Sequence, residues 1–457
     1  MMIYSGLVFA LLLFSASARQ ASSFDISPAL ARQYKCSQSC LDLYNTKTKP
    51  TDKANFPDTY SDDFYATASN FSHSQPGDLL KLKVADSSKL NIAPGTTVYR
   101  FQYTSIDLDG SNVPATGFIS FPYTFMSWAN PPTQNTFRLA AWAHGTSGLY
   151  YGCVPSSSPT LYDTSTWQQL VQEGYAVVGT DYVGIGNNHT SHKFLSFPIQ
   201  ATDVYYSIVA ARKAFGHVFS HEWVSIGHSQ GGGVVWKLAE SKYAQDPDSD
   251  YLGTVAIAPA TYVVDLMLKN FSTYPRPGIS AVLTTSLKRA VPSYEESCLA
   301  PIMKARLELE EKAQVCFFAA VGMAADLSLS QIMSAAGLAK DLPLFANWQS
   351  KMAPALGAKS PAPILVIQGG NDSFILPYIT AKAVDRSCAS GNEVTLSVYP
   401  EMEHSSVIPA SVLEWLPWIN QLFDRDQTSE QTKHLCSRVV REPFDKIHLK
   451  TPSEVNF

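Results

Sequence analysis

Hydrophobic stretches of strand length alternate with helical patterns along the middle of the chain. A turn signal, Asp109-Gly110, separates the first two stretches, so we expect them to form an antiparallel hairpin. The six stretches are residues 97–106, 116–122, 137–143, 175–180, 222–226 and 254–258. A helical pattern at 201–215 lies between the fourth and the fifth of them. This alternation predicts the α/β fold class with a mostly parallel sheet.

The strand pattern stops at about residue 261 and returns only near residue 363, and helical patterns fill the interval. Two further strands are expected at 363–369 and 394–399, followed by a helix near 412–423. We therefore predict a helical cap inserted between strands 6 and 7. The apolar stretch 315–323 within it is expected to line an acyl-binding tunnel, to form an interfacial surface, or to pack as a buried helix against the core.

The chain begins with an apolar stretch, residues 3–14, followed by Ala16-Ser17-Ala18, which is typical of a secretory signal with its cleavage site. No later stretch is long and apolar enough to span a bilayer. The expected organisation is a signal peptide (1–18), an N-terminal lead-in packed on the core (19–95), the first part of the core (96–260), the cap (261–360), the second part of the core (361–425) and a C-terminal extension (426–457).

The segment Gly227-His228-Ser229-Gln230-Gly231 has the pattern G-x-S-x-G and lies where a predicted strand meets a predicted helix. This strand–turn–helix context is that of a nucleophile elbow, in which a sharp turn exposes the serine hydroxyl. Ser229 is therefore the predicted nucleophile, and His228, at the variable position of the motif, is expected to be structural.

A serine hydroxyl needs a base to remove its proton and an acid to orient that base. In α/β-hydrolases the acid and the histidine follow the serine in that order. Asp372 follows the strand at 363–369, and His404 follows the strand at 394–399, so both lie at carboxyl ends of strands. We predict the triad Ser229, Asp372 and His404. The competing acids are Glu401, Glu403 and Asp265, and the alternative role for Asp372 is that of a turn residue.

Acyl transfer also needs two amide donors for the oxyanion of the tetrahedral intermediate. One is expected from Gln230, the residue after the nucleophile. The other is expected from the His144-Gly145-Thr146 segment that follows the strand at 137–143, with Gly145 or Thr146 as the donor. The alternative interpretation of this segment is a plain glycine turn.

Secretion would place the seven cysteines in an oxidising compartment, where disulfides are favoured over a metal site. We expect Cys388 to pair with Cys436 and Cys153 to pair with Cys316. The odd count leaves at least one thiol free or paired between chains. Glycosylation is expected at three Asn-x-Ser/Thr sites, at Asn70, Asn188 and Asn270.

The charge of the chain limits the kinds of partner that it is expected to bind. The formal net charge is −5 and only 16% of residues are charged, without a basic block, which argues against nucleic-acid binding. No nucleotide-binding glycine motif occurs in the sequence, and neither a cofactor nor a metal ion is expected. The expected partner is a small-molecule ester or lipid, with transient contact between the cap and a lipid interface.

Several motifs together resemble the secretory lipase family of fungi and some bacteria, of the Candida lipase A type. The matching segments are residues 142–148, Cys153-Val154-Pro155-Ser156, residues 180–186, the elbow at 227–231, Gly370-Asn371-Asp372 and Glu403-His404. The resemblance spans roughly residues 90 to 425. It implies an α/β-hydrolase core with a helical cap, hydrolysis of carboxylic esters and no metal. Some members resemble deacetylating esterases, including trichothecene deacetylases.

The predicted function is therefore that of a secreted serine carboxylic-ester hydrolase, acting through an acyl-enzyme on acylglycerols or other apolar esters. The alternative within this class is a short-acyl esterase that deacetylates a secondary metabolite such as a trichothecene. Acyl transfer to an alcohol needs the same residues and differs in the access of water. Two competing functions for the same fold are those of a serine peptidase and of a non-catalytic binding module.

Overall fold

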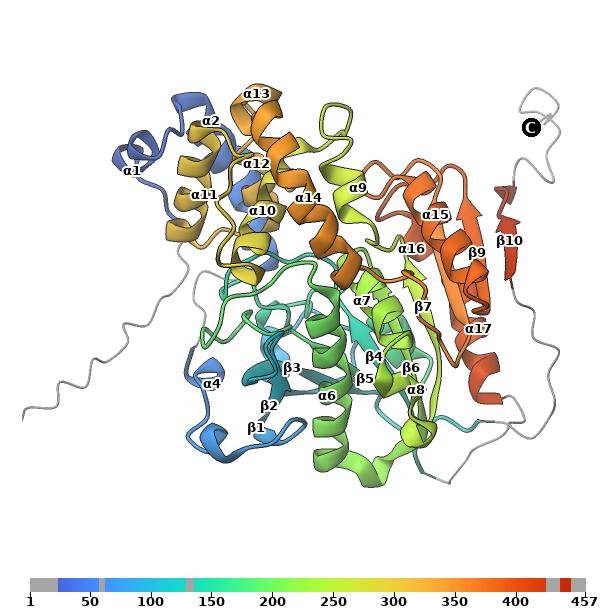
Figure 1. Ribbon diagram of the computed structural model, residues 1–457. Coiled ribbons are helices and arrows are strands. Elements are labelled where there is room, and N and C mark those ends of the chain that lie inside the picture. The colour runs from blue at the N-terminus through green and yellow to red at the C-terminus, as the bar shows by residue number, and fades with distance from the viewer. Residues whose placement is uncertain (1–23, 57–61, 129–134, 425–435, 445–457) are drawn as a thin grey trace, which may run out of the picture.

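A computed structural model describes residues 24–56, 62–128, 135–424 and 436–444 (Figure 1). The expected signal peptide lies outside the described residues. Within them, no helix is long and apolar enough to cross a membrane.

The described residues form one ten-stranded sheet in the order β1-β2-β3-β5-β4-β6-β7-β8-β9-β10. The strands from β5 to β10 in this order run parallel, and β1, β2 and β3 pair antiparallel at the other side. The strands are β1 (Leu79–Val84), β2 (Thr97–Ile106), β3 (Asn112–Phe121), β4 (Phe137–Ala143), β5 (Ala176–Thr180), β6 (Phe219–His228), β7 (Tyr251–Ile257), β8 (Ile364–Gly369), β9 (Val394–Tyr399) and β10 (Cys436–Val440). The predicted hairpin is confirmed, because Ile106 of β2 pairs with Asn112 of β3 across the Asp109-Gly110 turn.

Two strands were not predicted. β1 lies within the expected lead-in and β10 lies within the expected extension, and both border the sheet. Their residues are mostly half-buried or exposed, so the hydrophobic signal that marks the central strands is weak in them. Because β1 precedes the others, the helical insertion lies between the seventh and eighth strands of the structure, β7 and β8.

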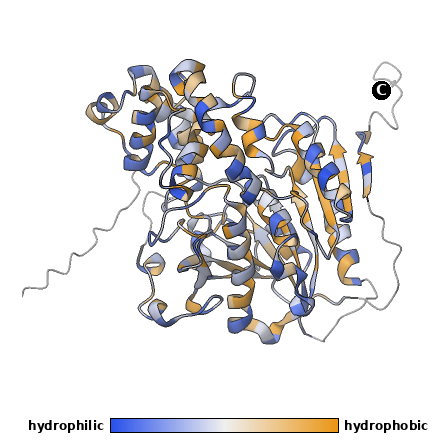
Figure 2. Ribbon diagram, viewed as in Figure 1, coloured by the Kyte–Doolittle hydropathy of each residue, from blue (hydrophilic) through white to orange (hydrophobic). Residues whose placement is uncertain are grey.

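Helices cover both faces of the sheet, as the alternation of side chains along each strand requires. In β6, Val224 and Ile226 join the cluster under α5 (Trp167–Gln172) and α17 (Val412–Asp424). The opposite face is covered by α6 (Phe197–Phe215), α7 (Gln230–Ala239) and α15 (Pro377–Ala389). In Figure 2 the parallel strands near α15 are largely hydrophobic, while hydrophilic residues are spread along the helices.

The insertion between β7 and β8 consists of six helices and the loops that join them. In Figure 1 it lies above the carboxyl ends of the parallel strands. It comprises α9 (Val263–Met267), α10 (Pro277–Ala290), α11 (Pro301–Ala313), α12 (Phe317–Gly322), α13 (Leu329–Ile332) and α14 (Ala335–Met352). We call this segment the cap. The domain boundaries that we expected around it stay predictions.

The lead-in packs against the cap through its own helices. α3 (Lys49–Asn55) contacts α12, and the carboxylate of Asp52 accepts hydrogen bonds from the amides of Phe318 (3.1 Å) and Ala319 (3.0 Å) at the start of α12. The Asp52 carboxyl thus satisfies two amides at the start of the helix, which have no partner within the helix. The lead-in therefore helps to fix the helix that carries Phe317 and Phe318.

Two of the three disulfides among the described residues link distant segments. Cys153–Cys316 joins the loop after β4 to the cap, and Cys388–Cys436 joins α15 to β10, as expected. A third disulfide, Cys36–Cys40, lies in the lead-in, and Cys298 is the buried free cysteine.

Of the expected glycosylation sites, Asn70 and Asn188 are exposed, whereas Asn270 is half-buried and its side chain donates a hydrogen bond to Tyr378. Glycosylation stays a prediction at all three.

Candidate active site

Ser229 lies in a sharp turn between β6 and α7. Its backbone has φ 58° and ψ −118°, a conformation that costs free energy for a residue with a side chain. The turn is held from both sides, because the Ser229 amide donates to the Ile257 carbonyl (2.9 Å) and the Ser229 carbonyl accepts from the Ala260 amide (2.9 Å). The neighbouring strand therefore fixes the turn that exposes the hydroxyl.

The two glycines of the elbow are required by close backbone packing. A β-carbon at Gly227 would lie 2.3 Å from the carbonyl oxygen of Gly231, and one at Gly231 would lie 1.9 Å from the carbonyl oxygen of Ala143. Side chains at these positions would overlap the backbone of the elbow or of β4. The G-x-S-x-G spacing is thus explained by the packing of β6, α7 and β4.

Asp372 and His404 meet at the carboxyl ends of β8 and β9. Nδ1 of His404 donates to Oδ2 of Asp372 at 2.7 Å, and the Asp372 side chain is fully buried. Glu401, Glu403 and Asp265 do not take this place; Asp265, for example, pairs with Lys269 and Lys382 at the edge of the cap. The structure therefore brings together the acid and the histidine that the sequence analysis paired.

The Asp372 carboxylate is held ionised in spite of its burial. Burial alone would raise its pKa, but the hydrogen bond and charge of His404 and the amides of Ile375 (2.9 Å) and Phe374 (2.8 Å) outweigh it and lower the pKa below its usual value. An ionised carboxylate at Nδ1 keeps the other ring nitrogen free to accept a proton.

Ser229 and His404 line one pocket of about 200 Å³. No hydrogen bond joins the two side chains in the part of the chain that the structure describes; catalytic hydrogen bonds often tighten only when substrate binds. The pocket is otherwise mainly apolar and aromatic. Its lining comprises Gly145, Thr146, Tyr162, Thr164, His228, Ser229, Phe317, Phe318, Phe374, His404 and Ser405.

The expected oxyanion donors lie beside Ser229. A β-carbon placed on Gly145 would be 3.6 Å from the β-carbon of Ser229, and Thr146 lines the pocket together with Ser229. Gln230 begins α7, so its amide lies at the positive end of a helix dipole. The segment after β4 and the start of α7 thus border the nucleophile, as an oxyanion hole requires.

Three residues near the triad were not identified from the sequence as supporting it. Nε2 of His228 donates to the backbone carbonyl of His404 (2.9 Å), and burial lowers the pKa of His228 to about 3, so its ring is neutral. Nε2 of Gln368 donates to Oδ2 of Asp372 (3.2 Å), and the Phe374 ring stacks on the His404 ring at 5.1 Å. His228 is structural, as expected, but what it supports is the loop of the catalytic histidine.

The two aromatic residues at the start of α12 also belong to the site. Phe317 and Phe318 line the pocket, while Ala319 and Ala320 are buried against neighbouring helices. Within the apolar stretch 315–323, Phe317 and Phe318 thus line the pocket, and Ala319 and Ala320 pack as part of a buried helix, which is one of its expected roles.

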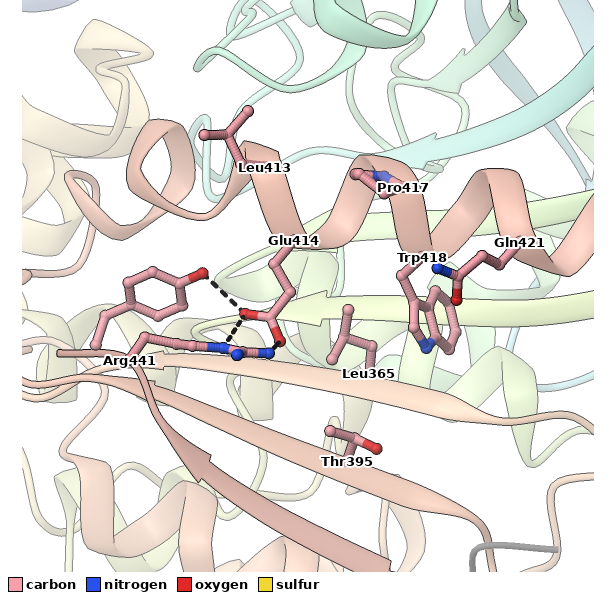
Figure 3. A pocket seen from close by; sticks show the side chains of 9 residues that line it. Leu365, Thr395, Leu413, Glu414, Pro417, Trp418, Gln421 and Arg441 are labelled. Carbon is pink, nitrogen blue, oxygen red and sulfur yellow. Dashed lines mark hydrogen bonds and ion pairs between the residues drawn. The ribbon is translucent and has the colours of Figure 1, made fainter. Parts of the chain in front are cut away.

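A larger hollow lies away from the triad, beside α17 and the strands β8, β9 and β10 (Figure 3). It measures about 490 Å³, and its charged residues are already paired: Arg441 donates to Glu414 (2.6 Å), which also accepts from Tyr399 (2.8 Å). Its lining lacks a serine or cysteine nucleophile. The described residues also contain no group of three side chains suited to hold a metal ion.

Comparison with solved structures confirms the fold. The chain is 17% identical to Candida antarctica lipase A in its closed state, with a TM-score of 0.62 over 82% of this chain and 88% of that one. It is also 17% identical to the rice cell wall degrading esterase LipA from Xanthomonas oryzae, with a TM-score of 0.58 over 77% of this chain and 98% of that one. The likeness to lipase A that the sequence motifs suggested therefore holds for the fold.

The sequence itself also matches a family profile. No curated protein matches the chain. Residues 158–408, more than half of the chain, match the family described as serine aminopeptidase, S33. This range contains the elbow, Asp372 and His404. The chain thus belongs to the serine aminopeptidase S33 family and has the α/β-hydrolase fold.

Proposed function

We propose that this protein is a serine carboxylic-ester hydrolase. The observation that carries the proposal is one mainly apolar pocket that is lined by both the half-buried elbow serine, Ser229, and His404, whose ring is oriented by buried Asp372 at 2.7 Å. A nucleophile, a base and an orienting acid are the parts that acyl transfer requires.

In the proposed reaction, Oγ of Ser229 bonds to the acyl carbon while Nε2 of His404 takes the hydroxyl proton. The negative charge on the former carbonyl oxygen is stabilised by the amide of Gln230 and that of Gly145 or Thr146. As the intermediate collapses, the bond to the alcohol oxygen breaks and His404 returns the proton to that oxygen. Water, deprotonated by His404, then attacks the acyl-enzyme; the bond between the acyl carbon and Oγ of Ser229 breaks, His404 returns the proton to Oγ, and the acid is released.

The pocket lining favours a neutral substrate. Apart from His404 and His228, the residues that line the pocket are aromatic, hydroxylated or glycine. Acylglycerols and short-acyl esters of a secondary metabolite, such as a trichothecene, are both neutral esters that suit this lining. Phe318, 43% exposed at the pocket, is the cap residue best placed for the transient lipid contact that the sequence analysis expected.

The family description names an aminopeptidase, so peptide hydrolysis is the competing activity. An aminopeptidase has to bind the positive N-terminus of its substrate, which a carboxylate in the pocket would do. Among the described residues, those that line the pocket around Ser229 include no Asp or Glu. The geometry therefore favours esters over peptides with a free N-terminus.

We also propose that the protein acts outside the cell. The support is the sequence of the first 18 residues together with three disulfides among the described residues. Disulfides persist in oxidising compartments and are rare in the cytosol. N-terminal sequencing of the protein recovered from the culture medium would check both secretion and the expected cleavage after Ala18.

The test is the hydrolysis of p-nitrophenyl acetate and of leucine p-nitroanilide by the purified protein. We expect turnover of the ester and none of the anilide. Ser229→Ala should lower kcat for the ester by about 10⁴-fold or more, while Ser330→Ala, at an exposed position of α13, should match the wild type. Ester turnover that survives Ser229→Ala, or preferred turnover of the anilide, would contradict the proposal.

A further inference from the structure

Ser229 lies between two compartments of unequal size. The large compartment is the pocket of about 200 Å³ described above; the small compartment measures about 30 Å³. Thr146, Ser229, Phe317 and Phe374 line both, so the two Phe rings stand at the boundary. The remaining lining of the small compartment is Phe194, Leu195, Gln230, Ala260, Met267, Tyr274, Ile279 and Ile375.

The chemistry of the reaction assigns one part of the substrate to each compartment. His404 lines the large compartment, and it is not one of the described residues that line the small compartment. Because His404 has to protonate the departing alcohol oxygen, the alcohol part of the ester lies on its side, in the large compartment. The acyl part then extends the other way, into the small compartment beside Gln230.

The small compartment is closed by buried, mainly apolar side chains. Met267 of α9, Ile279 of α10 and Tyr274, which lies between these two helices, are each at most 4% exposed, and Ile375 and Leu195 close it from the core side. The Tyr274 hydroxyl donates to the carbonyl of Phe374 (3.0 Å), which fixes this wall to the segment after Asp372. The cap therefore supplies the end wall of the acyl site.

The volume limits the length of the acyl chain. The small compartment, at about 30 Å³, has less than a sixth of the volume of the large one, at about 200 Å³, so only a short acyl group fits between Ser229 and the end wall. We propose that the protein hydrolyses acetyl or propionyl esters of larger apolar alcohols, and that Met267 and Ile279 set the limit on acyl length. This inference rests on the proposed function.

Two isomeric esters separate the two sides of the site. Octyl acetate and ethyl octanoate have the same composition, but the long chain lies on the alcohol side of the first and on the acyl side of the second. With acid release followed by pH-stat, we expect kcat/KM for octyl acetate to exceed that for ethyl octanoate by at least about tenfold. Equal rates, or a preference for ethyl octanoate, would overturn the inference. Failure to cleave either ester would instead contradict the proposed function.

Variants of the end wall test the residues named. Across p-nitrophenyl esters from acetate to octanoate, Ile279→Ala and Met267→Ala should each raise kcat/KM for butyrate or hexanoate relative to acetate, by about tenfold. The matched control is Leu283→Ala, which removes the same number of non-hydrogen atoms from a buried position of α10 outside the pocket lining. It should keep the wild-type profile. A profile that is unchanged in both wall variants, or shifted equally in Leu283→Ala, would overturn the assignment of these residues.

Discussion

Some side chains near Ser229 contact a second element and so help to position the residues of the proposed site. His228 is the clearest example: its Nε2 donates to the carbonyl of His404, and its ring packs 4.6 Å from the His404 ring. His228 directly precedes Ser229 in the chain, and its hydrogen bond also supports the loop that carries His404. His228 is thus placed to set the distance between the serine and the histidine.

We expect His228→Leu to lower kcat by about tenfold to a hundredfold, because the buried carbonyl of His404 would lose its donor, a loss of about 1–3 kcal/mol. His228→Gln, which offers an amide donor of similar reach, should recover most of the activity, and KM should change little in either variant. Equal losses in both variants, or a change confined to KM, would show that the hydrogen bond does not position the base.

Asp372 determines which ring nitrogen of His404 carries a proton. Asp372→Asn should lower kcat at neutral pH by about 10⁴-fold, since an amide donor at Nδ1 stabilises the wrong tautomer. Asp265→Asn is the control, because that carboxylate pairs with Lys269 and Lys382 instead. A small effect of Asp372→Asn, or a large one of Asp265→Asn, would contradict the assignment of the acid.

At the scale of elements, the segment after β4 and the cap are held together at one point. The Cys153–Cys316 disulfide joins them, and the amide of Phe317 donates to the carbonyl of Ser147 (3.0 Å). These links hold Phe317 beside Thr146, at the boundary of both compartments. The start of α12 therefore cannot move away from the oxyanion segment while the disulfide is intact.

Removing this disulfide by the double change Cys153→Ser and Cys316→Ser should lower the free energy of unfolding by about 2–4 kcal/mol, because it links residues 163 positions apart. Chemical denaturation under non-reducing conditions would measure the loss. The pair Cys36→Ser and Cys40→Ser is the control: its sequence separation is 4, so the loss should be clearly smaller. Similar losses for both pairs would argue against this contribution of the disulfide.

The whole molecule contains several buried carboxyl groups whose protonation depends on folding. Burial raises the pKa of Asp52 and Glu240 to about 7, of Asp181 to about 6 and of Asp203 to about 8, while it lowers the pKa of His144 to about 4 and of His192 to about 3. Near pH 5 the buried carboxyl groups make the folded state less stable as pH rises, whereas the buried histidines make it more stable. Above about pH 6.5 the histidines of the unfolded chain are mostly neutral as well, so the carboxyl groups dominate the pH dependence.

A carboxyl with a raised pKa in the native state stabilises the fold while it is protonated and loses that contribution as pH rises through the native pKa. We therefore expect Tm to fall between pH 6.5 and 8.5, with each such carboxyl contributing at most about 1.4 kcal/mol per pH unit. Glu240→Gln removes one of these groups and should make the decline shallower. A Tm that rises over this range would contradict the assignment.

The sequence predicted the order of the central elements well, because β4, β5, β7 and β8 are buried on both faces and form continuous apolar runs. The residues of the proposed triad could also be named, since the elbow motif and the order of the fold constrain them. The support around them could not. The contact between His228 and His404 spans 176 positions in the chain, and neither residue carries a local signal for it. The sizes of the two compartments likewise depend on side chains from six or more segments.

The most direct measurement is to label the protein with diethyl p-nitrophenyl phosphate and to locate the label by mass spectrometry of the digested protein. This reagent traps an activated serine because its phosphoryl group mimics the acyl group under attack. We predict one diethylphosphoryl group per chain, on Ser229, with a parallel loss of ester hydrolysis and no labelling of His404→Ala. Labelling of a different residue, or full labelling of Ser229 with activity retained, would contradict the identification of Ser229 as the nucleophile of an ester hydrolase.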